Sequence, residues 1–127
     1  MAAAAMTSSG ATWHERFESS LAWCREVSSL GYDLLWWAGS DRDVDAQTTL
    51  SRLAAIDAGM DLAMLYLVPL YHPVRLTAEV ANWDRASGGR TTIAVAQGWR
   101  DRQFDAYGIP KAERLGRFTE ALDAMKQ

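Results

Sequence analysis

The chain has 127 residues, enough for one domain with one continuous core. Its formal net charge of −3 gives no basic surface for nucleic acid or an anionic membrane, and we expect neither partner. No apolar run reaches the roughly 20 residues of a membrane span, and the single cysteine cannot form an internal disulfide. We therefore expect a cytoplasmic protein.

The chain begins with an Ala/Ser/Thr-rich stretch without a secretory signal, and we expect a disordered leader over residues 1–12 and the domain over residues 13–127. Thr12 and Glu15 have the spacing of a capping box, which predicts a helix start. Gly31 is expected to end that helix. Its apolar stripe comprises Phe17, Leu21, Cys24, Val27 and Leu30.

The next segments predict a strand and a second helix. Residues 32–37 (YDLLWW) are apolar enough for a buried strand. Asp43 or Asp45 is expected to cap the helix, and Gly59 to end it. The inner face of this helix would comprise Leu50, Leu53 and Ala54.

Residues 61–99 predict a strand–helix–strand unit. The run from Leu62 to Val68 is almost uninterrupted, as in a strand covered on both faces. Pro73 suits a helix start and Gly88 a helix end. Residues 91–96 are short and β-branched, so they predict a second strand, parallel to the first.

After Trp99 we expect a polar loop that carries Phe104 and Tyr107, followed by a last helix. The apolar face of that helix would comprise Leu115, Phe118, Leu122 and Met125. Strands that alternate with helices in this way predict an α/β fold with a parallel sheet.

Several short motifs follow one another along the chain: HPVRL at residues 72–76, SGGR at 87–90, QGW at 97–99, then Phe104 and Gly108. In this order they resemble the luciferase-like monooxygenases, which are flavin- or deazaflavin-dependent oxidoreductases. The resemblance covers about residues 13–127 and implies a (β/α)8 TIM barrel. Such a barrel needs about 250 residues, so it implies a partial barrel, about the N-terminal half.

The resemblance implies an enzyme that uses reduced FMN and dioxygen to oxygenate a small organic substrate. Within the family the alternative is hydride transfer with a deazaflavin. The competing hypothesis is a non-catalytic half-barrel that serves as an interaction or assembly module. Unpaired edge strands would favour self-association or pairing with a missing C-terminal half. An open flavodoxin-like sheet is the structural alternative.

In a barrel of this type, the chemistry lies at the carboxyl ends of the strands. His72 is the candidate catalytic residue, because an imidazole can transfer a proton near neutral pH. The alternative is that it only organises the helix start. Gln97 and Gly98 are candidate cofactor-binding residues, through the amide and through close backbone approach. The alternative for Gly98 is a turn after the strand.

Trp37, with Trp36 and Trp99, is a candidate for an apolar site that binds the flavin ring or an aliphatic substrate, with core packing as the alternative. Ser40 is also placed among the cofactor-binding residues. By count, Gly39 and Ser40 stand where many relatives have an acidic residue and a histidine, and a hydroxyl cannot replace an imidazole as a base. The sequence has no metal-ligand spacing.

The remaining polar and aromatic residues have structural interpretations. We expect a charge set around the third helix and its turn, formed by Glu79, Asp84 and Arg90. We expect a solvated face on the last helix, formed by Glu113, Arg114 and Arg117. We expect Cys24 to be buried and His14 exposed, and either Tyr66 or Tyr71 to face the barrel interior.

Overall fold

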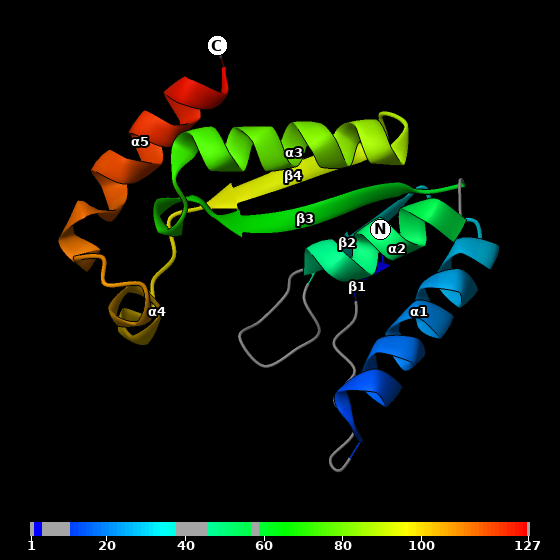
Figure 1. Ribbon diagram of the computed structural model, residues 1–127. Coiled ribbons are helices and arrows are strands. Elements are labelled where there is room, and N and C mark those ends of the chain that lie inside the picture. The colour runs from blue at the N-terminus through cyan, green and yellow to red at the C-terminus, as the bar shows by residue number, and fades with distance from the viewer. Residues whose placement is uncertain (1, 4–10, 38–45, 57–58, 127) are drawn as a thin grey trace. The chain divides into compact units, whose positions relative to one another are not determined.

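The computed structural model describes residues 2–3, 11–37, 46–56 and 59–126, and strands alternate with helices along them (Figure 1). The strands are β1 (Ala2–Ala3), β2 (Leu34–Trp37), β3 (Asp61–Leu67) and β4 (Thr91–Ala96). The helices are α1 (Trp13–Ser29), α2 (Ala46–Ile56), α3 (Pro73–Ser87), α4 (Asp101–Ala106) and α5 (Arg114–Met125), with 3-10 turns η1 (Val68–Leu70) and η2 (Lys111–Glu113). The predicted caps Asp43 and Asp45, and residues 4–10 of the predicted leader, lie outside the described residues.

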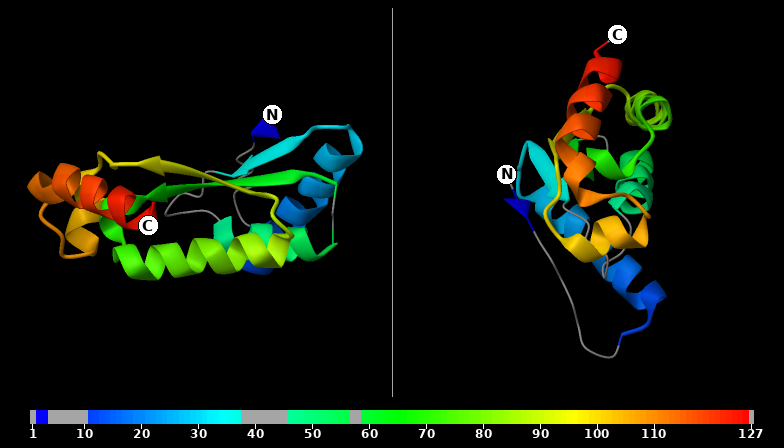
Figure 2. Two further views of the ribbon diagram at one scale, coloured as in Figure 1. Left: turned by 90° about the horizontal axis from the view of Figure 1, so that it is seen from above. Right: turned by 90° about the vertical axis from the view of Figure 1, so that its left-hand side faces the viewer.

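Within the described residues the strands form one sheet in the order β1-β2-β3-β4. β1 pairs parallel with β2, and β2 pairs parallel with β3, with Leu35 opposite Leu62 and Trp36 opposite Ala63. The arrows of β3 and β4 point the same way in Figure 1 and in the left view of Figure 2. The predicted α/β fold with parallel strands is therefore confirmed. The two-residue strand β1 was not predicted.

The contacts divide the chain into two compact units, Met1–Leu65 with Trp83–Ile93, and Tyr66–Asn82 with Ala94–Gln127. In the first unit the core joins α1, α2, β2 and the start of β3, and its fully buried side chains include Leu21, Cys24, Leu35, Leu50, Leu53 and Leu62. In the second unit α5 packs on η1. Its buried side chains include Tyr66, Val68, Leu76, Phe104 and Ala121.

The capping box at the start of α1 is present as predicted. The Thr12 hydroxyl accepts from the Glu15 N–H at 3.3 Å, and the Glu15 carboxylate accepts from the Thr12 N–H at 2.7 Å. The Thr12 N–H and the Thr12 hydroxyl both donate to the Glu15 carboxylate, and these bonds lower its pKa because they favour its charged form. The helix ends before Gly31, which has a φ of +79°. Leu30 is 68% exposed, so its assignment to the apolar stripe is wrong: it lies beyond the last helical turn.

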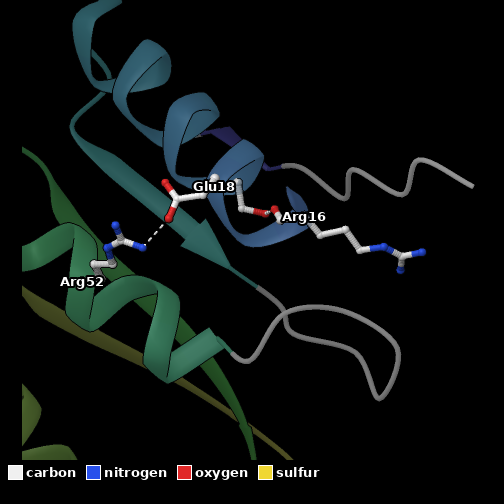
Figure 3. A network of polar contacts seen from close by, with 4 residues as sticks. Arg16, Glu18 and Arg52 are labelled. Carbon is white, nitrogen blue, oxygen red and sulfur yellow. Dashed lines mark hydrogen bonds and ion pairs between the residues drawn. The ribbon is translucent and has the colours of Figure 1, made fainter. Parts of the chain in front are cut away.

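An ion pair joins α1 to α2. Nη1 of Arg52 lies 2.6 Å from Oε1 of Glu18, and Figure 3 shows the two side chains meeting between the helices while Arg16 points away from them. The guanidinium of Arg52 also lies 5.2 Å above the ring of Phe17. The hydrogen bond from Arg52 lowers the pKa of the Glu18 carboxyl.

The C-terminus of α3 has the predicted glycine stop. Gly88 and Gly89 have φ values of +73° and +80°. The Gly89 N–H donates to the Asp84 carbonyl at 2.9 Å, and the Gly88 N–H donates to the Arg85 carbonyl at 3.2 Å. These two bonds satisfy carbonyls at the helix end that have no intrahelical partner.

The guanidinium of Arg90 binds backbone carbonyls from three segments. It donates to Met60 at 2.6 Å, to Ala54 at 3.2 Å and to Ser87 at 2.9 Å. These carbonyls belong to the residue before β3, to α2 and to the end of α3. The predicted charge set of Arg90 with Asp84 and Glu79 is therefore wrong, because Arg90 is used to satisfy helix-end and loop carbonyls.

Several predicted boundaries shift by a few residues. The second strand begins at Leu34, two residues later than expected, and α2 ends at Ile56, before the expected Gly59. The third strand ends at Leu67, because Pro69 has no N–H for the sheet and the chain enters η1. Thr91–Ala96 is a strand over the predicted residues.

The segment after Trp99 differs from the expected polar loop. Residues 101–106 form α4, which buries Phe104 to 1% exposure. A single large aromatic residue with polar neighbours carries no helical periodicity, and this helix was therefore missed. In α5 the Leu115 side chain is 60% exposed, so its place on the apolar face is wrong, while Ala121 is buried. Arg117 and Glu113, two residues of the expected solvated face, form an ion pair at 2.9 Å.

Candidate functional site

The carboxyl end of β3 leads to His72 in the second unit. After η1, the Tyr71 N–H donates to the Val68 carbonyl at 3.1 Å, which closes the turn. The His72 carbonyl then accepts the first helical hydrogen bond of α3, from the Leu76 N–H at 3.0 Å. Pro73 follows at the first helical position. His72 thus starts the helix with its backbone, and its side chain is exposed.

The carboxyl end of β4 leads to Gln97 and Gly98, both half-buried. Gly98 has a φ of +74°, and a Cβ there would lie 3.3 Å from the ring of Phe104 and 3.8 Å from Cδ1 of Leu67. Two features of the turn favour glycine at position 98, the positive φ and the close approach of the Phe104 ring. Its contact with Leu67 also shows that the ends of β3 and β4 lie together.

Trp99 follows this turn and is 73% exposed. The guanidinium of the neighbouring Arg100 lies 5.1 Å from the centre of its ring. A guanidinium over an indole face is attracted to it electrostatically. Because most of the side chain is exposed, Trp99 presents aromatic surface to solvent just after the end of β4.

At the end of β2, in the first unit, the two adjacent tryptophans lie on opposite faces of the strand. Trp37 is 6% exposed and its ring meets that of Trp23 in α1 edge to face, with centroids 6.4 Å apart. Trp37 therefore has a packing role on the helix-covered face. Trp36 is half-buried and lies beside Ala63 of β3. Ser40 and Gly39 lie outside the described residues.

Sequence reasoning placed Trp37 ahead of Trp36 as a cofactor contact. Side chains in a strand alternate between faces, so Leu35 and Trp37 share one face and Trp36 lies on the other. Leu35 and Trp37 are buried, at 0% and 6% exposure. The face that carries Trp36 is the less covered one, as its half-buried neighbours Leu34 and Leu65 show.

Metal-ligand clusters and membrane-spanning helices are both absent from the described part of the chain. No three His, Cys, Asp or Glu side chains come together there as a metal site would require. No helix among the same residues has both the length and the apolar composition to cross a bilayer.

Comparison with known proteins identifies the family. The family model described as luciferase-like monooxygenase matches residues 1–127. The 4-hydroxyprotoasukamycin monooxygenase of Streptomyces nodosus subsp. asukaensis is 27% identical over 115 residues, which are 91% of this chain and 29% of that protein. The chain thus spans about a third of the length of such relatives, less than the half that we expected.

Solved structures show the same fold. The oxygenating constituent of 3,6-diketocamphane monooxygenase from Pseudomonas putida, in complex with FMN, matches with a TM-score of 0.82 and 17% identity over 91% of this chain and 34% of that chain. The coenzyme F420-dependent tetrahydromethanopterin reductase of Methanopyrus kandleri matches with a TM-score of 0.60 and 21% identity over 74% and 27%. On the family match over its whole length, this chain belongs to the luciferase-like monooxygenase family.

Proposed function

We propose that this chain acts in a flavin-dependent oxygenation, in which reduced FMN and dioxygen oxidise a small organic substrate. The observation that carries the proposal is the meeting of the ends of β3 and β4, where Leu67 lies 3.8 Å from the Cβ position of Gly98. In parallel α/β folds, ligands bind at the carboxyl ends of the strands. The family membership and the FMN in the 3,6-diketocamphane enzyme support the same chemistry.

The residues at these two strand ends fit a flavin, whose ring has apolar faces and a polar edge. The Gln97 amide carries both donors and an acceptor for that edge, and half-buried Leu67 offers apolar contact to a face. The exposed His72 side chain is the candidate for proton transfer, because imidazole is a common general acid and base. When bound, the flavin supplies the reaction with dioxygen, and these residues would bind it, orient it and handle the proton.

Trp36, half-buried on β2 of the first unit, stays a prediction as an aromatic contact. Trp37 and Ser40 stay predictions as cofactor contacts. For Trp37, a Trp37→Phe variant separates the two roles: a packing role lowers stability and leaves flavin affinity unchanged, whereas a cofactor contact changes flavin affinity.

Binding of FMN to the full chain tests the proposal directly. Quenching of tryptophan fluorescence on titration with FMN is the expected result. Gln97→Ala should weaken binding about five- to tenfold, the size of one or two lost hydrogen bonds. His72→Gln should lower the rate of oxygenation, because it removes the imidazole proposed to handle the proton, and His14→Gln, at the other histidine, is its matched control. Absence of any binding of FMN or a deazaflavin would contradict the proposal.

Hydride transfer with a deazaflavin is the alternative within the family. It is favoured by the structural match to the F420-dependent reductase. The same titration with a deazaflavin in place of FMN distinguishes the two, since the cofactor that binds more tightly identifies the chemistry.

A second candidate function is self-assembly through the edge of the sheet. β4 is the last strand in the described sheet, its six residues carry no charge or proline, and Thr92 is exposed. Such an edge can pair with the same strand of a second copy. Thr92→Lys should then abolish a concentration-dependent dimer in sedimentation, and Thr119→Lys on α5 should not. A wild-type monomer at all concentrations would exclude this function.

A further inference from the structure

A buried tyrosine and a carboxylate meet beneath the turn that carries His72. Tyr66, near the end of β3, is 3% exposed, and its hydroxyl lies 3.4 Å from Oε1 of Glu79 in α3. The Glu79 side chain is 15% exposed, and Nε of Arg75 lies 3.7 Å from its other oxygen. The Arg75 side chain is 79% exposed, so the sheltered contact of the carboxylate is the one with the Tyr66 hydroxyl, and a contact away from water is stronger than one in solvent.

The ring of Tyr66 is also the support for Tyr71. The two rings meet edge to face, with centroids 5.5 Å apart and planes at 80°. Tyr71 closes the η1 turn through its N–H, and the next residue, His72, starts α3 through its carbonyl. The orientation of Tyr66 therefore bears on the backbone that places the His72 side chain.

We infer that Tyr66 and Glu79 are positioning residues, which fix the Tyr71–His72 turn at the carboxyl end of β3. Glu79 holds the Tyr66 hydroxyl, Tyr66 holds the Tyr71 ring, and Tyr71 holds the backbone of the turn. Tyr66 lies on the side of β3 that faces α3, and Glu79 lies in α3 itself, so both would act through the turn and not by contact with the flavin. Their effect on flavin binding rests on the proposed function, whereas their effect on the turn does not.

The experiment uses the full chain and two readouts, hydrogen exchange at the backbone amides of Tyr71 and Leu76, and affinity for FMN. Tyr66→Phe keeps the ring and removes the hydroxyl, and Glu79→Ala removes its acceptor. Both should raise exchange at these amides about five- to tenfold relative to the rest of the chain, and weaken FMN binding by a similar factor. Tyr107→Phe, at an exposed tyrosine of the same unit, is the matched control and should change neither.

Rescue by a conservative variant separates positioning from general stabilisation. Glu79→Gln keeps an acceptor oxygen and should restore slow exchange at Tyr71 and most of the FMN affinity. Unchanged exchange in Tyr66→Phe, or a uniform rise over the whole chain, would overturn the inference. If the wild type bound no FMN, the proposed function would fail, and the exchange data would still decide on the positioning role.

Discussion

The guanidinium of Arg90 donates to the Met60 carbonyl at 2.6 Å, and so links the residue before β4 to the residue before β3. The same side chain also holds carbonyls of Ala54 and Ser87, at 3.2 and 2.9 Å. A planar guanidinium can serve three acceptors at once, which a lysine ammonium or an apolar side chain cannot do in the same geometry. Arg90 is therefore a structural residue that joins three segments far apart in sequence.

Replacing Arg90 tests this role. Arg90→Met should lower the free energy of unfolding by about 2–4 kcal/mol, since it leaves carbonyls without their charged donor. Arg90→Lys should recover only part of the loss. Urea denaturation followed by tryptophan fluorescence measures both, with Arg85→Met, at an exposed position of α3, as the control. Wild-type stability of Arg90→Met would show that these hydrogen bonds contribute nothing.

Gly98 and Gly108 allow backbone strain to be separated from crowding. Both have positive φ, +74° and +63°, but a Cβ at Gly98 would lie 3.3 Å from Phe104, whereas one at Gly108 would meet nothing within 4 Å. Gly108→Ala should cost about 1–2 kcal/mol from conformation alone. Gly98→Ala should cost roughly 1 kcal/mol more from overpacking. Equal losses of unfolding free energy in chemical denaturation would rule out the crowding contribution.

Cys24 should be chemically inert in the folded chain. It is fully buried on α1, and burial raises the pKa of its thiol to about 12. Because the thiolate is the reactive form, the native chain should react with an aromatic disulfide reagent at pH 8 at least roughly a thousandfold more slowly than the urea-unfolded chain. Equal rates would mean that the α1 core opens readily.

The ion pair of Glu18 with Arg52 should stabilise the fold in a pH-dependent way. The folded-state pKa of Glu18 is lowered by the hydrogen bond from Arg52, so the contribution is present above the ordinary carboxyl pKa. It is lost as the pH falls through the lowered value. The small stability difference between wild type and Glu18→Gln should therefore vanish in acid and shrink at high salt. Glu26→Gln, on the same helix, is the control, and a difference that persisted in acid would contradict this assignment.

The sequence predicted helix ends well where their chemistry is local. The capping box needs only Thr12 and Glu15, and the end of α3 needs only Gly88 and Gly89, so a few adjacent residues decide the structure. Periodicity was less reliable at the outer ends of helices. Leu30 and Leu115 satisfy the spacing of an apolar stripe and are nevertheless exposed, because none of the described segments covers them.

The candidate site could be predicted in part. The parallel order of β3 and β4 brings Leu67 to Gly98, as a strand–helix–strand unit requires. Side-chain alternation along β2 puts Trp36 and Trp37 on opposite faces, but it does not say which face a helix covers. The packing of Trp23, from α1, against Trp37 supplies that information, and it comes from a distant part of the sequence. The roles of His72 and Gln97 stay predictions.

Because the tryptophans differ in exposure, intrinsic fluorescence can report where a ligand binds. Trp99 and Trp13 are 73% and 62% exposed, while Trp37 and Trp83 are 6% and 3% exposed. The two exposed indoles should emit at longer wavelengths and be quenched by acrylamide. The two buried indoles should emit at shorter wavelengths and be protected from acrylamide quenching. A ligand that binds beside the end of β4 should quench the long-wavelength emission first. The variant Trp13→Phe would remove the other long-wavelength signal, which comes from α1.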